Sequence, residues 1–143
     1  MPKKFEFLEH TADVYVRAYG TDLKEAFENA ALALFETMTD TSKIEPRIED
    51  EVEVEAEDEK ALLYSWLQEW LIKFDLTGNL YSNFKVESLE KMPNGLKIKG
   101  KAWGEPFDPA KHVQKIGIKS ITYHRMEIDK KPDRVTLKFI FDV

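Results

Sequence analysis

The chain has 143 residues and a formal net charge of −6 at pH 7, because its 27 acidic residues outnumber its 21 lysines and arginines. An acidic chain without a basic cluster is not expected to bind nucleic acid strongly by itself, since that affinity comes mainly from lysine and arginine at the phosphates. The absence of cysteine excludes a disulfide framework and a thiolate zinc site. The length predicts a single domain, residues 1–143, and the lack of a signal peptide or of an apolar run of about 20 residues predicts a cytoplasmic protein without membrane contact.

A segment with several ionisable side chains joins the first two predicted strands. Residues 5–9 and 14–19 are expected to be strands, and His10 and Asp13 lie in the connection between them. A simple turn would be better served by Asn, Gly or Pro, whereas an imidazole and a carboxylate can move a proton or bind a cation. Asp13 falls on the same side of the second strand as Tyr15. This connection is therefore the first candidate for a functional site.

Two long amphipathic helices are predicted from apolar residues at helical spacing. The first spans Leu23 to Met38, with Thr21 as its N-cap. The second begins at Asp58 and Glu59, acids that suit the positive end of a helix. Its apolar residues form a stripe too wide for a partly exposed helix: Leu62, Leu63, Trp66, Leu67, Trp70, Leu71 and Phe74. The two tryptophans are interpreted as core, or as core plus a surface for a partner.

Two further acidic features admit more than one interpretation. Asp40 follows the first helix and either stabilises a turn or acts as a metal ligand near Asp13; taken alone, its position favours the turn. Residues 51–57 alternate glutamate with an apolar residue, which predicts a strand with one buried and one acidic face. Such glutamates fan out along a strand rather than converge, so a solvated face is favoured over a calcium site.

The C-terminal half is rich in predicted β-structure. Residues 93–95 (Pro-Asn-Gly) and 130–133 are typical of hairpin turns. The predicted strands are residues 80–89, 96–103, 116–128 and 134–143, with a loop at 104–109. Hairpins dominate and two helices are available to cover the sheet. We therefore predict an α+β fold, a mostly antiparallel β-sheet with two long amphipathic helices packed on it.

The strand at 116–128 carries apolar residues on both faces, which predicts a central place in the sheet. Lys119 in this strand must reach solvent or meet carboxylates, because an unpaired buried ammonium is costly. A turn centred near residue 131 places residue 120 opposite Asp142 in the last strand. Lys119 is therefore expected within a residue of Asp142.

Asp13 and Asp142 can meet if the strands that carry them are neighbours or face one another. Hard oxygen ligands on rigid elements suit a divalent cation, but a carboxylate so near a terminus is usually a solvated end-group, and the residues alone favour that interpretation. Two of them supply fewer than the roughly six to eight oxygens that calcium prefers, so water or a third ligand such as Asp40 would have to complete the site. The three histidines lack the spacing of a zinc site, and His10 is instead expected to hydrogen bond or transfer a proton near Asp13.

Several motifs together resemble the archease family. They follow the family's order along the whole chain: Glu9-His10-Thr11-Ala12-Asp13, then Ala18-Tyr19-Gly20, then Leu62-Leu63 with Trp66-Leu67, then Ile118-Lys119-Ser120-Ile121-Thr122-Tyr123-His124, and terminal Phe141-Asp142-Val143. Tyr15, Val16 and residues 72–74 depart from the family's pattern, at positions of packing rather than chemistry.

The resemblance implies a non-enzymatic activator of the tRNA-splicing RNA ligase, which joins RNA ends with GTP and manganese through a guanylylated histidine. Proteins similar to this chain help the ligase to become guanylylated and to turn over repeatedly. The resemblance also implies a divalent-metal site at Asp13 and Asp142, with Asp40 as a third candidate, and partner activation by His10 and Lys119. Calcium is the first expectation for the metal, with magnesium or manganese as alternatives.

Two other functions stay open on the sequence. The family is also linked to a tRNA cytosine methyltransferase, so a chaperone or specificity modulator of that enzyme is one alternative. A small metal-dependent hydrolase that uses the same acids, with His10 as acid or base, is the other. Turnover of GTP or cyclic-phosphate RNA by the protein alone would favour the hydrolase, and suppressed aggregation of the methyltransferase would favour the chaperone.

Overall fold

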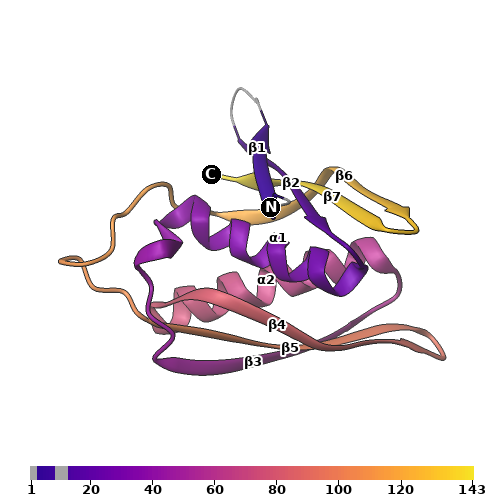
Figure 1. Ribbon diagram of the computed structural model, residues 1–143, viewed down its shortest axis with the longest axis horizontal. Helices are drawn as coiled ribbons and strands as arrows, with labels where there is room; N and C mark the ends of the chain where they lie inside the picture. Colours follow the sequence, from indigo (N-terminus) through magenta and orange to yellow (C-terminus); the bar gives the residue numbers. More distant parts are fainter. Residues whose placement is uncertain (1–2, 9–12) are drawn as a thin grey trace.

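The computed structural model describes residues 3–8 and 13–143, which form three layers: a four-stranded sheet, a layer of two helices and a three-stranded sheet (Figure 1). The elements in chain order are β1 Phe5–Leu8, β2 Val14–Gly20, α1 Leu23–Met38, β3 Ile48–Ala56, α2 Glu59–Thr77, β4 Asn79–Met92, β5 Gly95–Pro106, β6 Ser120–Lys131 and β7 Arg134–Asp142, with a short 3₁₀ turn, η1, at Thr41–Lys43. All strand pairs described are antiparallel, which confirms the predicted α+β class. The strands divide into two sheets, ordered β1-β2-β7-β6 and β3-β5-β4, so the helices lie between sheets rather than on one.

Helix α1 has the predicted bounds but a different N-cap. Asp22, not Thr21, caps it, because the Asp22 carboxylate accepts a hydrogen bond from the backbone N–H of Glu25 at 2.9 Å. The Glu25 side chain in turn accepts from the backbone N–H of Thr21 at 2.7 Å. The prediction of Thr21 was wrong because the carboxylate one position later reaches the free N–H groups of the first turn.

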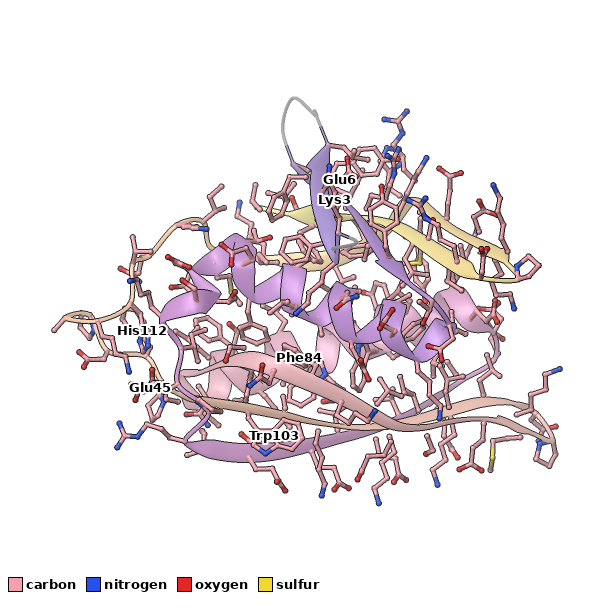
Figure 2. All side chains as sticks on the ribbon, in the orientation of Figure 1. Lys3, Glu6, Glu45, Phe84, Trp103 and His112 are labelled. Atoms are coloured by element: carbon pink, nitrogen blue, oxygen red, sulfur yellow. The ribbon has the colours of Figure 1, made fainter. Side chains whose placement is uncertain are left out.

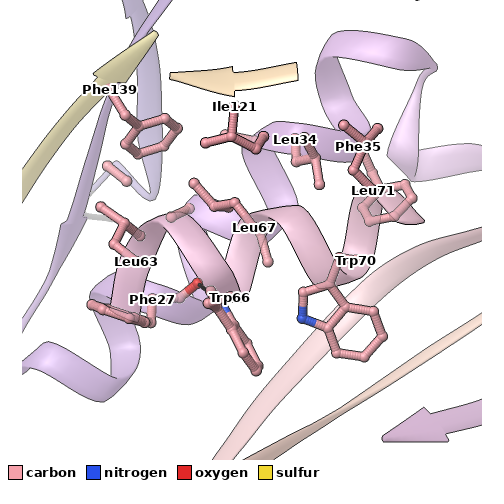
Figure 3. Packing of buried hydrophobic residues seen from close by; sticks show 14 of the residues in the cluster. Phe27, Leu34, Phe35, Leu63, Trp66, Leu67, Trp70, Leu71, Ile121 and Phe139 are labelled. Atoms are coloured by element: carbon pink, nitrogen blue, oxygen red, sulfur yellow. Dashed lines mark hydrogen bonds between the residues drawn. The ribbon is translucent and has the colours of Figure 1, made fainter. Parts of the chain in front are cut away.

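Helix α2 is covered on two sides, as its wide apolar stripe predicts. Leu63 and Leu67 lie on the side of β7, whereas Trp66 and Trp70 point the other way (Figure 3). Gly100 of β5 makes room for Trp66, because a Cβ at that position would lie 2.5 Å from the indole ring. Within the described chain, neither helix is long and apolar enough to cross a membrane.

The outer face of the three-stranded sheet carries the predicted row of glutamates, and lysines of β5 pair with it. The pairs are Lys97–Glu53 at 3.1 Å, Lys99–Glu51 at 3.6 Å and Lys101–Glu49 at 3.6 Å. Trp103 also points outward here, away from the helices (Figure 2). Exposed pairs of this kind contribute at most about 1 kcal/mol each, and the glutamates do not converge on one point.

Strand β6 lies at the edge of the four-stranded sheet, so its predicted central place was wrong. It also begins at Ser120 rather than at residue 116. The predicted register is confirmed, because Ser120 pairs with Asp142. The count from the turn gives the right register because two deviations from it cancel each other. The turn lies one or two residues later than residue 131, and β6 contains a bulge at residues 123–126, opposite Phe139 alone.

Candidate metal and partner-binding site

Three chain segments meet where β2 begins, β7 ends and β6 begins. Val14 of β2 pairs with Phe141 of β7, so Asp13 and Asp142 are the next residues along these two neighbouring strands. On the other side of β7, Ser120 pairs with Asp142, and its hydroxyl lies 3.4 Å from the Asp142 carboxylate. The pairing of β2 with β7 thus brings the two predicted carboxylates to the same end of the sheet.

Lys119 lies immediately beside this end of the sheet. Its backbone N–H donates a hydrogen bond to the carbonyl oxygen of Asp142 at 2.7 Å, and its side chain is exposed. The ammonium group therefore reaches solvent from a connecting segment, not from the centre of the sheet as predicted.

The segment that delivers Lys119, which we call the arm, comprises residues 107–119 between β5 and β6. It is tied to the end of α1. The Thr39 hydroxyl donates to the carbonyl oxygen of Val113 at 2.6 Å, and the backbone N–H of Lys115 donates to Met38 at 2.9 Å. Irregular chain of this length is held in place by specific contacts rather than by a strand ladder.

A buried carboxylate, Glu105, anchors the start of the arm. His112 accepts a hydrogen bond at Nδ1 from the backbone N–H of Asp108, so the ring proton sits on Nε2 and is donated to Glu105 at 2.9 Å. Burial alone raises the pKa of Glu105, but hydrogen bonds from Lys111 at 2.7 Å, from the backbone N–H of Glu45 at 2.9 Å and from His112 outweigh it. Together they hold the pKa at about 2.

Sequence reasoning missed this anchor. His112 and Glu45 lie together at one end of the molecule (Figure 2), although their positions in the sequence differ by 67. Glu105 falls in what the sequence predicts to be a loop, and no local spacing marks it. The only signal in the sequence is that two ionisable residues, Glu105 and His112, stand at the ends of a short segment with few apolar residues. Such segments are common on protein surfaces.

Asp40 stabilises a turn. It is the N-cap of η1, and its carboxylate accepts hydrogen bonds from the backbone N–H of Ser42 at 3.0 Å and from the Ser42 hydroxyl at 2.7 Å. These bonds hold the pKa of Asp40 below its usual value. Within residues 3–8 and 13–143, no group of three or more acidic or histidine side chains gathers as a metal site. The turn that the sequence favours for Asp40 is thus confirmed, and its role as a third metal ligand stays a prediction.

The remaining predicted residue, His10, lies with Glu9, Thr11 and Ala12 outside the described residues. Of the other two histidines, His112 is committed to Glu105, and His124 is exposed in the β6 bulge. These two give no support to a shared zinc site.

The donors at the end of the sheet fit a hard divalent cation. Asp13 and Asp142 offer carboxylate oxygens from neighbouring strands, and Ser120 adds a hydroxyl beside one of them. Oxygen donors of this kind suit calcium, magnesium or manganese, with water completing the coordination.

The family comparison covers almost the whole chain. Residues 5–143 match the model of the Archease protein family (MTH1598/TM1083). The archease proteins of Sulfurisphaera tokodaii and Thermococcus kodakarensis are each 49% identical to this chain, over 141 and 142 residues, and each alignment covers 99% of both proteins. Neither the family description nor these names states a reaction.

Two solved structures share the fold. The solution structure of Methanobacterium thermoautotrophicum protein 1598 has 43% identity and a TM-score of 0.86, and covers 98% of this chain and 99% of its own. The crystal structure of an archease, possible chaperone, from Thermotoga maritima has 22% identity and a TM-score of 0.59, with coverage of 100% and 98%. The sequence matches and the shared three-layer fold lead to one conclusion: the chain belongs to the archease family.

Proposed function

We propose that this protein activates the GTP- and manganese-dependent tRNA-splicing RNA ligase in the cytoplasm, promoting its guanylylation and repeated turnover. The observation that carries the proposal is the meeting of Asp13, Asp142 and Lys119 at one end of the four-stranded sheet. This surface combines two carboxylates with an exposed ammonium, a set that can hold a cation and contact a charged partner.

In this proposal Asp13 and Asp142 hold one divalent cation, with calcium as the first candidate. When bound, the cation supplies positive charge at the surface that meets the ligase. Asp142 is held by the start of β6, since the backbone N–H of Lys119 donates to its carbonyl oxygen and the Ser120 hydroxyl lies near its carboxylate. Lys119 then contacts the partner with its exposed ammonium, and His10 is the second residue proposed to take part in activation.

The test is ligation by the cognate ligase, at limiting ligase concentration, with and without this protein. Asp142→Asn should lower the number of turnovers per ligase. Asp133→Asn is the matched control, because it removes one carboxylate from the same hairpin at the opposite end of β7. If the Asp142→Asn protein activated the ligase as fully as the unchanged protein does, the proposal would be contradicted. The protein alone, without ligase, should turn over neither GTP nor cyclic-phosphate RNA.

A chaperone for a tRNA cytosine methyltransferase is the second candidate, favoured by exposed apolar side chains on the arm. Val113 is 54% exposed and Ile116 is 47% exposed. Apolar groups of this kind can shield a partner from aggregation. That function predicts suppressed aggregation of the methyltransferase that survives Asp142→Asn and is lost with Val113→Ser, whereas ligase activation should show the opposite dependence on Asp142.

A further inference from the structure

The outer face of the four-stranded sheet carries a stripe without acids. Strands β2 and β7 are its two central strands, and their outward side chains alternate with the buried ones. The register places Tyr15 beside Ile140, Arg17 beside Lys138 and Tyr19 beside Thr136, with Arg134 one step further. We call these seven residues the central stripe: Tyr15, Arg17, Tyr19, Arg134, Thr136, Lys138 and Ile140.

Apart from Asp13 and Asp142 at one end of the rows, the acids of this face lie on the outer strands. Glu6 belongs to β1 (Figure 2), where it accepts a hydrogen bond from the Tyr19 hydroxyl at 2.6 Å and lies 3.9 Å from Arg17. Glu127 belongs to β6 and lies 3.9 Å from Lys138. Cations thus occupy the middle of the face and anions its margins, although the chain as a whole has a net charge of −6.

Two arginines of this face lie over tyrosine rings instead of carboxylates. The guanidinium carbon of Arg134 lies 4.4 Å from the centre of the Tyr19 ring, and that of Arg125 lies 5.6 Å from the centre of the Tyr15 ring. Both arginines are exposed, and neither forms an ion pair with a carboxylate of the described residues. A guanidinium that lies over a ring and not against a carboxylate keeps N–H groups available for a planar anion or a phosphate.

The β6 bulge is what brings Arg125 onto this face. Arg125 has a positive φ of 57°, unusual for a residue other than glycine, so the bulged chain turns sharply there. Tyr123 in the same bulge stacks on Tyr64 of α2, with ring centres 4.4 Å apart. From the edge strand Arg125 reaches across β7 to Tyr15, and Ile140 between them is only 1% exposed although it belongs to the outward row.

The central stripe leads to the candidate metal site. Asp13 precedes Tyr15 by two residues and Asp142 follows Ile140 by two residues, so the carboxylates continue the same outward rows. Along these rows the surface therefore changes from cations to the pair of carboxylates that would hold a divalent cation. Such an order suits a polyanion that passes over the cations and ends at the metal.

We propose that the central stripe, together with Arg125, binds the phosphate backbone of single-stranded RNA and directs it toward the Asp13–Asp142 end; this inference rests on the proposed function. The narrow width of the stripe favours RNA over a protein partner. Neighbouring strands lie about 4.8 Å apart, so a stripe two strands wide accommodates one nucleic-acid backbone. A stable protein interface needs a broader surface, because it buries roughly 800 Å² on each side. The binding is weak, because only Arg17, Arg125, Arg134 and Lys138 contribute, and this agrees with the expected lack of strong autonomous binding.

The test measures binding of the protein alone to a short unstructured, fluorescently labelled RNA by anisotropy, at about 50 mM salt and without ligase or divalent metal. The Arg125→Gln/Arg134→Gln double variant should bind roughly tenfold more weakly and lose about one to two from the slope of log K against log salt. The matched control is Lys97→Gln/Lys99→Gln, which removes the same charge from the outer face of the other sheet. The control should bind RNA as the unchanged protein does.

Equal losses in the two double variants, or no measurable binding by the unchanged protein, would overturn the inference. So would stripe variants that bind RNA normally but are captured less by the ligase, which would assign the stripe to a protein partner. The ligation assay separates this inference from the proposed function. Lost RNA binding does not by itself remove guanylylation of the ligase, and a failure to activate the ligase leaves RNA binding by the free protein unchanged.

Discussion

The backbone N–H of Lys119 donates a 2.7 Å hydrogen bond to the carbonyl oxygen of Asp142. This bond extends the pairing of β6 with β7 by one residue beyond Ser120. It fixes the end of the arm against the last residue of β7 and leaves the Lys119 side chain exposed. The contribution of Lys119 to stability therefore comes from its backbone, whereas its exposed ammonium carries the proposed contact with a partner.

Lys119→Ala should leave the thermal midpoint nearly unchanged and sharply reduce activation of the ligase. Alanine keeps the backbone N–H, and the removed side chain is exposed, so the expected change in unfolding free energy is within about 0.5 kcal/mol. Calorimetry and the ligation assay measure the two quantities. Lys115→Ala is the control, because it removes an exposed lysine of the same arm that pairs with Glu36 at 2.6 Å. It should lower the thermal midpoint more than Lys119→Ala does and leave activation of the ligase unchanged. Normal activation by Lys119→Ala would contradict the role of its ammonium.

Asp13→Asn should weaken binding of a divalent cation while the fold stays intact. The change replaces one of two carboxylates at the shared end of β2 and β7 with a neutral group of the same shape. The loss of repulsion between neighbouring anions should leave the metal-free protein as stable as before or slightly more stable. Titration calorimetry with calcium, magnesium and manganese, next to thermal unfolding without metal, measures both. Unchanged affinity for all three ions would exclude Asp13 as a ligand.

Local patterns in the sequence predicted elements better than their assembly. The spacing of apolar residues identified α1 with its observed bounds, Leu23–Met38. The wide stripe of α2 correctly indicated cover on more than one side. The division into two sheets was not predictable in the same way, because alternation along a strand shows which side is buried but not which strand lies beside it.

In the candidate site, too, local positions were predictable from the sequence and contacts between distant segments were not. Asp13 and Asp142 were predicted from their positions at strand ends together with the family resemblance, and counting from the hairpin turn placed residue 120 opposite Asp142. The count succeeded because a later turn and a bulge cancel each other. Glu105 and His112 were missed, since their contact depends on how the arm folds back and not on any periodic pattern.

The N-cap of α1 can be tested by two substitutions. Asp22→Ala should lower the unfolding free energy by about 1 kcal/mol, because the backbone N–H of Glu25 loses its partner. Thr21→Ala should cost only a few tenths of a kcal/mol, since the Thr21 backbone N–H that donates to Glu25 is retained. Urea unfolding at neutral pH measures both. A larger loss for Thr21→Ala would return the cap to the position expected from the sequence.

Glu105→Gln should destabilise the protein at neutral pH and lose this effect in acid. The pKa of Glu105 falls from an ordinary 4.5 to about 2 in the folded state, which corresponds to roughly 3 kcal/mol of stability. Because the folded pKa is the lower one, this contribution is complete above about pH 5. It is lost as the pH falls from there toward 2, where the folded carboxylate also becomes protonated.

Urea unfolding of the two proteins across that pH range gives the difference in stability directly. Glu90→Gln is the matched control, because Glu90 is an exposed glutamate of β4 and its change should stay within about 0.5 kcal/mol at every pH. Backbone amide exchange along residues 107–119 should also rise in Glu105→Gln, since His112 and Lys111 lose the carboxylate that anchors the arm. A stability difference that does not shrink in acid would show that packing around Glu105, and not its charge, holds the arm.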